Sequence, residues 1–310
     1  MRVVVLAGGV GGAKFAAGMM HALPNPKDLT VVVNVGDDFE HFGLKICPDL
    51  DTVCYTLAGL ENPTTGWGRR QESWRVMDAL AALGGPTWFR LGDQDLATHL
   101  ERTRRWRAGE PLSQIVADFC RAWGVPARVL PVTDAAVPTI VLTPEGALPF
   151  QEYFVRRRWR PRVLGFRFEG AERARPAPGV LEALHTADAV FVAPSNPFVS
   201  IDPILAIPGV RQALAGKPVI AVSPIVGGQA LKGPAAKMFR ELGQTPSAAA
   251  VAAHYQGLLT HFVVDRRDAA SLDHLQTLVA QVWVADTVMT TPAHRQRLAA
   301  ELLQRLSEAS

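Results

Sequence analysis

Short apolar runs alternate with longer segments in which apolar residues recur every three or four positions. The clearest runs are 2–7 (RVVVLA), 29–35 (LTVVVNV), 187–194 (ADAVFVAP) and 217–224 (KPVIAVSP). Near-continuous apolar strands, connected by helices, are typical of a parallel sheet that is covered on both faces. The pattern therefore predicts an α/β fold, with THFVVD and QVWVADT as its last two strands and a C-terminal amphipathic helix.

The middle of the chain follows other patterns. From about 50 to 125 the spacing is mainly helical, and one apolar run, TWFRL at 87–91, predicts a short strand within it. We interpret this region as a helical insertion in the sheet. Beyond it, the runs at 127–132 and 138–143 predict strands, and 147–157 with 162–170 predict an edge pair. No linker is long enough to divide the chain, so we expect one domain over 1–310.

Composition narrows the class of protein. With 310 residues, 48% hydrophobic and 20% charged, the chain fits a soluble protein with a large core. No apolar run approaches the ~20 residues of a membrane-spanning helix, and the N-terminal run is too short for a secretory signal. Cys47, Cys54 and Cys120 are an odd number and have no CxxC spacing, and no matching histidine pair accompanies them for a zinc site. We therefore expect free thiols, a cytoplasmic protein and no membrane partner.

Arginine supplies most of the 32 basic residues, although the net charge is only +3. The blocks 102–107 (RTRRWR) and 156–160 (RRRWR) suggest nucleic-acid binding. The alternative is a solvated helix face and an exposed strand end. We favour this alternative, and expect no nucleic-acid partner, because no basic face continues beyond the two blocks.

A glycine loop, GGVGGAK at 8–14, follows the first predicted strand. Backbone N–H groups in such a loop, with the dipole of the following helix, bind phosphate. The loop fits neither the Walker pattern nor GxGxxG, and Asn34 stands where an NAD site has an acidic residue. The alternative is a tight turn that binds nothing. The candidate phosphate-binding residues are Gly8, Gly9, Gly11, Gly12 and Lys14.

Acidic residues gather after the second strand. Asp37, Asp38 and Glu40 follow it, and Asp49 and Asp51 open the next helix. Carboxylates of this kind suit Mg²⁺, which takes one or two of them together with phosphate oxygens. Helix capping is the alternative for one of these acids, but it does not explain the whole group.

Two further segments in the insertion are ambiguous. In FRLGDQDLATHL at 89–100, Arg90 and His99 are candidate ligand groups, and Asp93 or Asp95 is expected to cap the following helix. Taken alone, His99 fits an ordinary helix position. Trp67, in GWGRR at 66–70, fits either a lid over a ring system or a surface turn.

Two later strands end in polar loops. Ser195 and Asn196 follow one, and Ser223, Gly227 and Lys232 follow the next. In a parallel sheet these loops share one edge with the glycine loop and the acidic residues. Together they describe a nucleotide and metal site better than any one motif.

Taken together, these blocks resemble the 2-phospho-L-lactate transferase (CofD/FbiA) family of coenzyme F420 biosynthesis. The matching stretches span residues 6 to about 291, and they are GGVGGAKF, VNVGDDFEHFGLKICPDLDTVCYTLAG, GWG, LGDQDLATHL, PLSQI, FQEYFV, APSNPFVSIDPIL, SPIVGGQALKGPAAK and ADTVMT. FQEYFV and the GDD form of the acidic motif look more like the bacterial branch.

The resemblance implies a fold and a reaction. Such enzymes have a Rossmann-like, mainly parallel core with helices on both faces and a helical insertion. They use Mg²⁺, form homodimers, and transfer a phospho-three-carbon acid from a guanosine diphosphate conjugate to the ribityl hydroxyl of the deazaflavin Fo. GMP is released, and in bacteria the donor looks to be the enolpyruvyl conjugate, giving dehydro-F420-0; other lineages use lactyl or other acids.

The resemblance also implies roles for individual residues. Asp51 matches a position that contacts Fo beside the metal, and Arg90 matches a second Fo contact. Gln94 departs from the arginine often found there. The candidate sets that follow are Asp51 and Asp38 for catalysis, Asp38, Asp49 and Asp51 for the metal, Asp51, Arg90, Trp67 and Asp93 for Fo, and the three loops at 8–14, 195–197 and 223–232 for the guanosine diphosphate.

Two other functions remain open on the residues alone. One is a nucleotide-sugar-binding regulator of the wider CofD-like superfamily, which would share the glycine loop and the SNP block but would not need GWG or FQEYFV. The other is an NAD-dependent dehydrogenase, which the failed GxGxxG pattern disfavours. A purely structural role explains the density of Gly, Asp, Ser and Asn least well.

Overall fold

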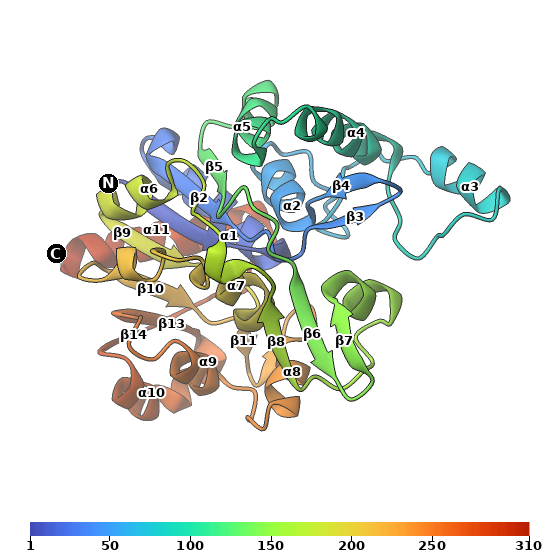
Figure 1. Ribbon diagram of the computed structural model, residues 1–310. Helices are drawn as coiled ribbons and strands as arrows, with labels where there is room; N and C mark the ends of the chain where they lie inside the picture. The colour runs from blue at the N-terminus through green and yellow to red at the C-terminus, as the bar shows by residue number, and fades with distance from the viewer. Residues whose placement is uncertain (310) are drawn as a thin grey trace.

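A seven-stranded sheet forms the centre of the computed structural model, which describes residues 1–309 (Figure 1). Every pairing in it is parallel, as predicted. In spatial order the strands are β14 (Gln281–Ala285), β13 (His261–Asp265), β10 (Val219–Val222), β9 (Ala189–Val192), β1 (Val3–Ala7), β2 (Leu29–Val33) and β5 (Arg128–Pro131). Most of their residues are buried, because helices cover both faces.

The order of these strands creates a crevice at the centre of the sheet. The chain runs outward from β1 to β2 and β5, then returns to β9 and continues outward on the other side. Val5 pairs with Val31 of β2 on one side and with Phe191 of β9 on the other. The loops after β1 and β9 consequently diverge, which is where open α/β sheets bind ligands.

Helices pack around this sheet. α1 (Gly9–Ala22) lies against α11 (Pro292–Ala309), and its Gly18 allows close contact with the backbone of Arg295. The shorter helices on the same core are α6 (Val180–Thr186), α7 (Asp202–Leu205), α8 (Ala235–Glu241), α9 (Ala248–His254) and α10 (Leu272–Leu278). The predicted C-terminal helix is confirmed.

The region from 50 to 125 is helical, as expected. It contains α2 (Pro48–Leu57), α3 (Arg75–Ala82), α4 (Asp93–Arg107) and α5 (Leu112–Ala122), and the hairpin of β3 (Phe39–His41) and β4 (Leu44–Ile46) lies beside them. α3 lies farthest from the sheet (Figure 1). The predicted strand at 87–91 is wrong: this segment is irregular, and its Phe89 and Leu91 pack into a small second core with Ile46 and Met77.

A separate antiparallel sheet contains β6 (Thr139–Thr143), β7 (Gly146–Pro149) and β8 (Gly165–Phe168). The predicted pairing of the last two is wrong, because β6 lies between them and pairs with both. The segment after β7 forms a π-helical turn, Glu152–Arg156, instead of continuing the strand. The short hairpin of β11 (Ile225–Val226) and β12 (Gln229–Ala230) follows β10.

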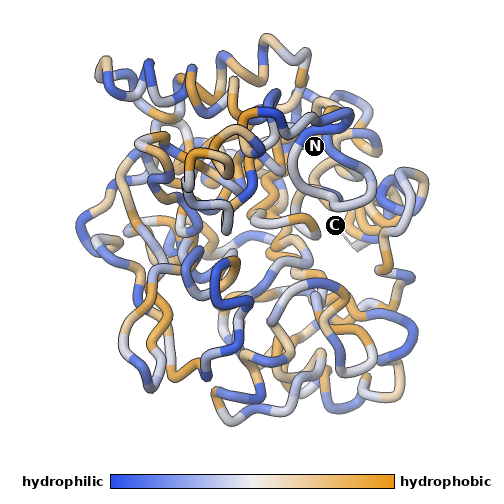
Figure 2. The backbone as a smooth tube through the Cα atoms, turned by 90° about the vertical axis from the view of Figure 1, so that its right-hand side faces the viewer, coloured by the Kyte–Doolittle hydropathy of each residue, from blue (hydrophilic) through white to orange (hydrophobic). Residues whose placement is uncertain are grey.

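Hydrophobic stretches are frequent in the interior of the backbone trace, and many of the hydrophilic stretches lie along its periphery (Figure 2). Among residues 1–309, no helix combines the length and the apolar character needed to cross a bilayer. The three cysteines are buried free thiols, as expected.

Candidate active site

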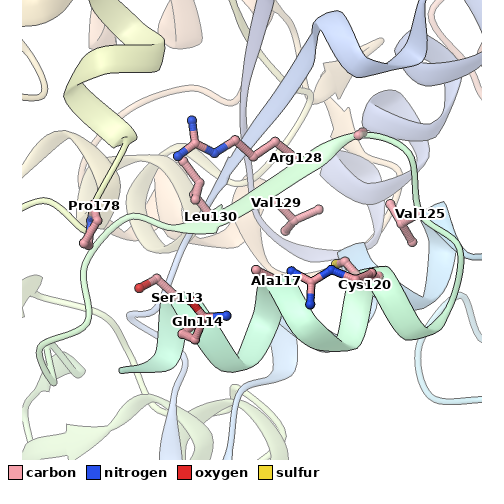
Figure 3. Close-up of a pocket in the computed structure, with 11 residues that line it drawn as sticks. Ser113, Gln114, Ala117, Cys120, Val125, Arg128, Val129, Leu130 and Pro178 are labelled. Atoms are coloured by element: carbon pink, nitrogen blue, oxygen red, sulfur yellow. The ribbon is translucent and has the colours of Figure 1, made fainter. Parts of the chain in front are cut away.

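A cavity of about 790 Å³ opens at the carboxyl edge of the central sheet. Loops after β1, β9, β10 and β14 form one side of it, and α2, α4 and the segment 65–68 form the other. The predicted placement of the polar loops at one edge is therefore confirmed. A smaller groove of about 430 Å³, between α5 and β5, contains none of the predicted site residues (Figure 3).

The glycine loop is joined to α2 by a carboxylate. The N–H of Gly9 donates to Oδ1 of Asp49 at 2.8 Å. A Cβ on Gly8 would come within 2.5 Å of Oδ2 of Asp49, so the backbone requires glycine there. Gly8, Gly9 and Gly11 line the cavity at the N-terminus of α1, where first-turn N–H groups other than that of Gly9 are available to an anion. Gly12 does not line it and packs against Ala7 and Ser195.

Two lysines reach the same end of the cavity. Nζ of Lys14 donates to the carbonyl of Met289 at 3.1 Å, and Nζ of Lys232 donates to the carbonyl of Thr65 at 2.9 Å. Burial lowers the pKa of Lys14, and the positive charges of Lys232 and Arg295 lower it further. Close cations of this kind are stabilised by a bound anion such as a diphosphate.

The serines of the later loops line the cavity but use their hydroxyls locally. Oγ of Ser195 donates to the carbonyl of Gly8 at 2.8 Å, and Oγ of Ser223 donates to that of Ile225 at 2.8 Å. Asn196 also lines the cavity and accepts the N–H of Phe198. These side chains hold the loops in shape.

Gly227 is not at the cavity. It lies in the turn between β11 and β12, where its N–H donates to Asp268. The predicted contact of Gly227 with a nucleotide is therefore not supported, because the hairpin turn points this residue toward another loop.

The floor of the cavity carries two buried carboxylates joined by an amide. Nδ2 of Asn34 donates to Asp37 at 3.1 Å and to Asp49 at 2.9 Å, and its oxygen accepts the N–H of Gly36. Asp37 and Asp49 line the cavity. Burial raises the pKa of Asp37, with the charge of Asp49 adding to it, and burial raises the pKa of Asp49 to about 6. This role of Asn34 was not predicted, although its position directly after β2 was a signal available in the sequence.

Asp38 is not brought to the cavity. It forms an ion pair with Lys45 at 3.4 Å, because the turn after β2 directs it toward the β3–β4 hairpin. Burial raises the pKa of Asp38, and Lys45 opposes this effect. The structure therefore does not support the expectation that Asp38 is a catalytic residue or a metal ligand beside Asp49 and Asp51.

A second acidic group lies on the insertion side of the cavity. Asp51 of α2 and Asp95 and His99 of α4 each offer a ligand atom, and these atoms lie within 4.8 Å of one another. The hydroxyl of Tyr55 donates to Asp95 at 2.7 Å. Burial raises the pKa of Asp95, but the nearby His99 and the hydrogen bond from Tyr55 outweigh it, so the pKa of Asp95 is lowered overall.

Arg102 completes this group. Its side chain is only 1% exposed, and both terminal nitrogens donate to the carboxylate of Asp51. Burial raises the pKa of Asp51, while Arg102 and His99 oppose the rise. The prediction of a solvated face for the whole block 102–107 is therefore wrong at this residue. Asp95, His99 and Arg102 recur at helical spacing along α4, and a polar stripe of that kind was the signal available in the sequence.

The helix caps in the insertion also differ from prediction. Asp93 accepts the N–H groups of Arg75 and Val76 and so caps α3. Glu72 accepts the N–H groups of Gln94 and Asp95 and so caps α4. Asp93 does not line the cavity, so the structure does not place it beside a bound acceptor.

Arg90 and Trp67 complete the insertion side of the cavity, whereas Gln94 does not reach it. Arg90 lines the cavity and stacks on the ring of Trp74 at 4.1 Å. Trp67 is half exposed at the cavity mouth. The side chain of Gln94 donates to the carbonyl of Gln71 and does not line the cavity.

Comparison with known proteins gives one consistent family. The profile described as "2-phospho-L-lactate transferase CofD" matches residues 3–303. A relative from Streptomyces griseus, named phosphoenolpyruvate transferase, is 45% identical, with 99% of each chain covered. A relative of the same name from Thermobifida fusca is 48% identical, covering 87% of this chain and 88% of its own.

Solved structures agree with the fold. A member of the UPF0052 family from Bacillus halodurans superposes with a TM-score of 0.61 at 14% identity, covering 97% of this chain and 98% of its own. At this identity the likeness supports the architecture alone.

Proposed function

This chain belongs to the 2-phospho-L-lactate transferase CofD family, and from that premise we propose that it transfers a phosphoenolpyruvyl group to the deazaflavin Fo. The donor is a guanosine diphosphate conjugate, the acceptor is the ribityl hydroxyl of Fo, and the products are dehydro-F420-0 and GMP. The name phosphoenolpyruvate transferase, carried by relatives over 40% identical, supports enolpyruvyl rather than lactyl or glyceryl as the acid.

The observation that carries this proposal is the division of the cavity into two chemically different sides. The glycine loop with Lys14 and Lys232 provides N–H groups and positive charge, which suit a diphosphate. Asp51, Arg90 and Trp67 face the same space from the insertion. A carboxylate, a guanidinium and an indole there suit the hydroxyls and the ring of an acceptor.

The acidic floor fits Mg²⁺. Asp37 and Asp49 provide hard oxygen ligands at the cavity, and burial raises the pKa of both carboxyls, which a bound cation would offset. Asp51, by contrast, is already paired with Arg102. We therefore assign the metal to Asp49 with Asp37, and Asp51 to the acceptor beside it. Bound Mg²⁺ would neutralise charge on the diphosphate.

In the transfer, the ribityl oxygen forms a bond to the phosphorus that carries the acid, and the bond from this phosphorus to the bridging oxygen of GMP breaks. Asp51 accepts a hydrogen bond from the attacking hydroxyl, orients it and takes its proton. Lys14 and the glycine-loop N–H groups hold the departing GMP phosphate. Phosphoryl transfer depends mainly on such positioning and charge.

A turnover assay tests the proposal. Purified protein, Mg²⁺ and Fo are combined with the enolpyruvyl, lactyl or glyceryl conjugate separately, and GMP and phosphorylated deazaflavin are measured by mass spectrometry. Product with the enolpyruvyl donor is expected. No product with any donor, from protein that still binds GDP, would indicate a nucleotide-binding regulator instead.

From the family we also propose that the protein is a homodimer and that it is located in the cytoplasm. Size-exclusion chromatography with light scattering tests the homodimer.

A further inference from the structure

We propose that Arg102 is a positioning residue for the transfer: it holds the carboxylate of Asp51 in the one orientation that faces the acceptor. This inference rests on the proposed function. Its basis is the contact between α4 and α2, in which a fully buried guanidinium meets a carboxylate at the cavity wall.

Arg102 and Asp51 form a bidentate ion pair. Nη1 of Arg102 donates to Oδ2 of Asp51 at 3.1 Å, and Nη2 donates to Oδ1. Two parallel bonds prevent the carboxylate from rotating about its last torsion, whereas a single bond would leave that rotation free. Arg102 itself does not line the cavity, so it acts on a bound molecule only through the lining residues that it contacts.

The same guanidinium orients His99. Nη1 lies 3.2 Å from Nδ1 of His99. A guanidinium has only donors, so a hydrogen bond between the two requires Nδ1 to accept, and in the neutral ring the proton is then on Nε2. Nδ1 also lies 3.6 Å from Oδ2 of Asp51, so the position of the ring proton depends on how Arg102 holds both groups. Nε2 lies 3.4 Å from Oδ1 of Asp95. One buried cation thus sets both the rotation of Asp51 and the tautomer of His99, two groups that line the cavity.

A second arginine on α4 shows what a purely structural role looks like. Arg105 joins Glu110 and Asp118, each at 2.5 Å, and ties α4 to α5 away from the cavity. Arg102 carries a higher desolvation cost, since it is fully buried, and Nε of its guanidinium has no hydrogen-bond partner. A lysine at position 102 would keep the positive charge but could not form both parallel hydrogen bonds to the carboxylate.

The kinetic test compares Arg102→Lys and Arg102→Ala with Arg105→Ala as the matched control. In both Arg102 variants we expect kcat to fall about 100-fold, as for a small misplacement of a reacting group, while the KM for the donor stays near the wild-type value. Millimolar guanidinium should restore part of kcat in Arg102→Ala. Arg105→Ala should lose thermal stability and keep kcat.

A second measurement does not depend on turnover. ¹⁵N-histidine NMR should show His99, assigned with His99→Gln, as the Nε2–H tautomer in the wild type and as a mixture in Arg102→Ala. Wild-type kcat in Arg102→Lys, or an unchanged tautomer in Arg102→Ala, would overturn the inference. Absence of wild-type turnover would instead contradict the proposed function, and the NMR result would still decide whether Arg102 orients His99. If Arg102→Ala does not fold, the lysine variant provides the kinetic result and Arg102→Met the NMR result.

Discussion

Glu72 and Asp93 cap each other's helices. Glu72, which precedes α3, accepts N–H groups at the start of α4, and Asp93, the first residue of α4, accepts N–H groups at the start of α3. The two acids also lie at positive ends of helix dipoles, where negative charge is favourable. This exchange holds together the outer part of the insertion, including the loop that carries Arg90.

Removing one of these helix caps should lower the stability of the protein but leave its catalytic activity unchanged. We expect Glu72→Ala to reduce the free energy of unfolding by about 1 kcal/mol, the usual value of a helix cap, and to leave kcat near the wild-type value because Glu72 does not line the cavity. Urea denaturation followed by circular dichroism measures the first effect. Asp93→Ala is the matched variant, and loss of Fo binding by that variant in a folded state would restore a substrate role for Asp93.

In the metal-free protein, the contribution of Asp49 to stability should fall as the pH rises from about 4 to about 6. Burial raises the pKa of Asp49 to about 6 in the folded state, whereas an unfolded aspartate has a pKa of about 4. The folded state therefore binds the proton more tightly, so stability is highest below pH 4 for this group and is lost as the pH rises to about 6, by roughly 2–3 kcal/mol in total. Asp49→Asn should flatten this dependence between pH 4 and 7. Equal slopes in both proteins would contradict the assignment.

Magnesium should restore the stability that the metal-free protein loses at high pH. If Mg²⁺ binds Asp49 with Asp37, adding it at pH 8 should raise the melting temperature of the wild type, because a ligand that binds only the folded state stabilises it. Asp49→Asn should lose most of this shift, and Asp38→Asn should keep it, since Asp38 faces Lys45 rather than the cavity. If Asp38→Asn lost the shift in melting temperature and Asp49→Asn kept it, Asp38 rather than Asp49 would be the metal ligand.

Asp51 is expected to be essential for turnover. Asp51→Asn keeps the size of the side chain but loses the charge and one acceptor of the bidentate pair with Arg102. We expect kcat to fall at least about 100-fold, and stability to fall by up to about 3 kcal/mol because a buried guanidinium loses its partner. Kinetics in protein shown to be folded by circular dichroism measures both. Near-normal turnover would remove Asp51 from the mechanism.

Lys14 should matter for the nucleotide rather than for the acceptor. We expect Lys14→Met to raise the Kd for GDP about tenfold, which corresponds to about 1.4 kcal/mol, because the variant removes a cation from the cavity wall. Calorimetric titration with GDP measures this, and the exposed Lys27 provides the control variant. A normal Kd for GDP in Lys14→Met would move the diphosphate away from the glycine loop.

The sequence alone determined the parallel sheet, the helical insertion and the grouping of polar loops at one edge. Because both faces of the sheet are covered, β1, β9 and β10 are apolar throughout, and β2 is apolar except for Thr30. A pattern of this kind can be recognised from each short segment by itself. The motifs also indicated the family, because they are long and spread over most of the chain.

Only the tertiary structure decided which way individual side chains point. Asp37 and Asp38 are neighbours, yet one lines the cavity and the other pairs with Lys45. Arg102 and Arg105 share one basic block, yet one is buried against Asp51 and the other ties α4 to α5. Residue type and spacing specify what a side chain is able to bind, but its partner is set by contacts between elements far apart in the chain, and those depend on how the insertion packs against the sheet.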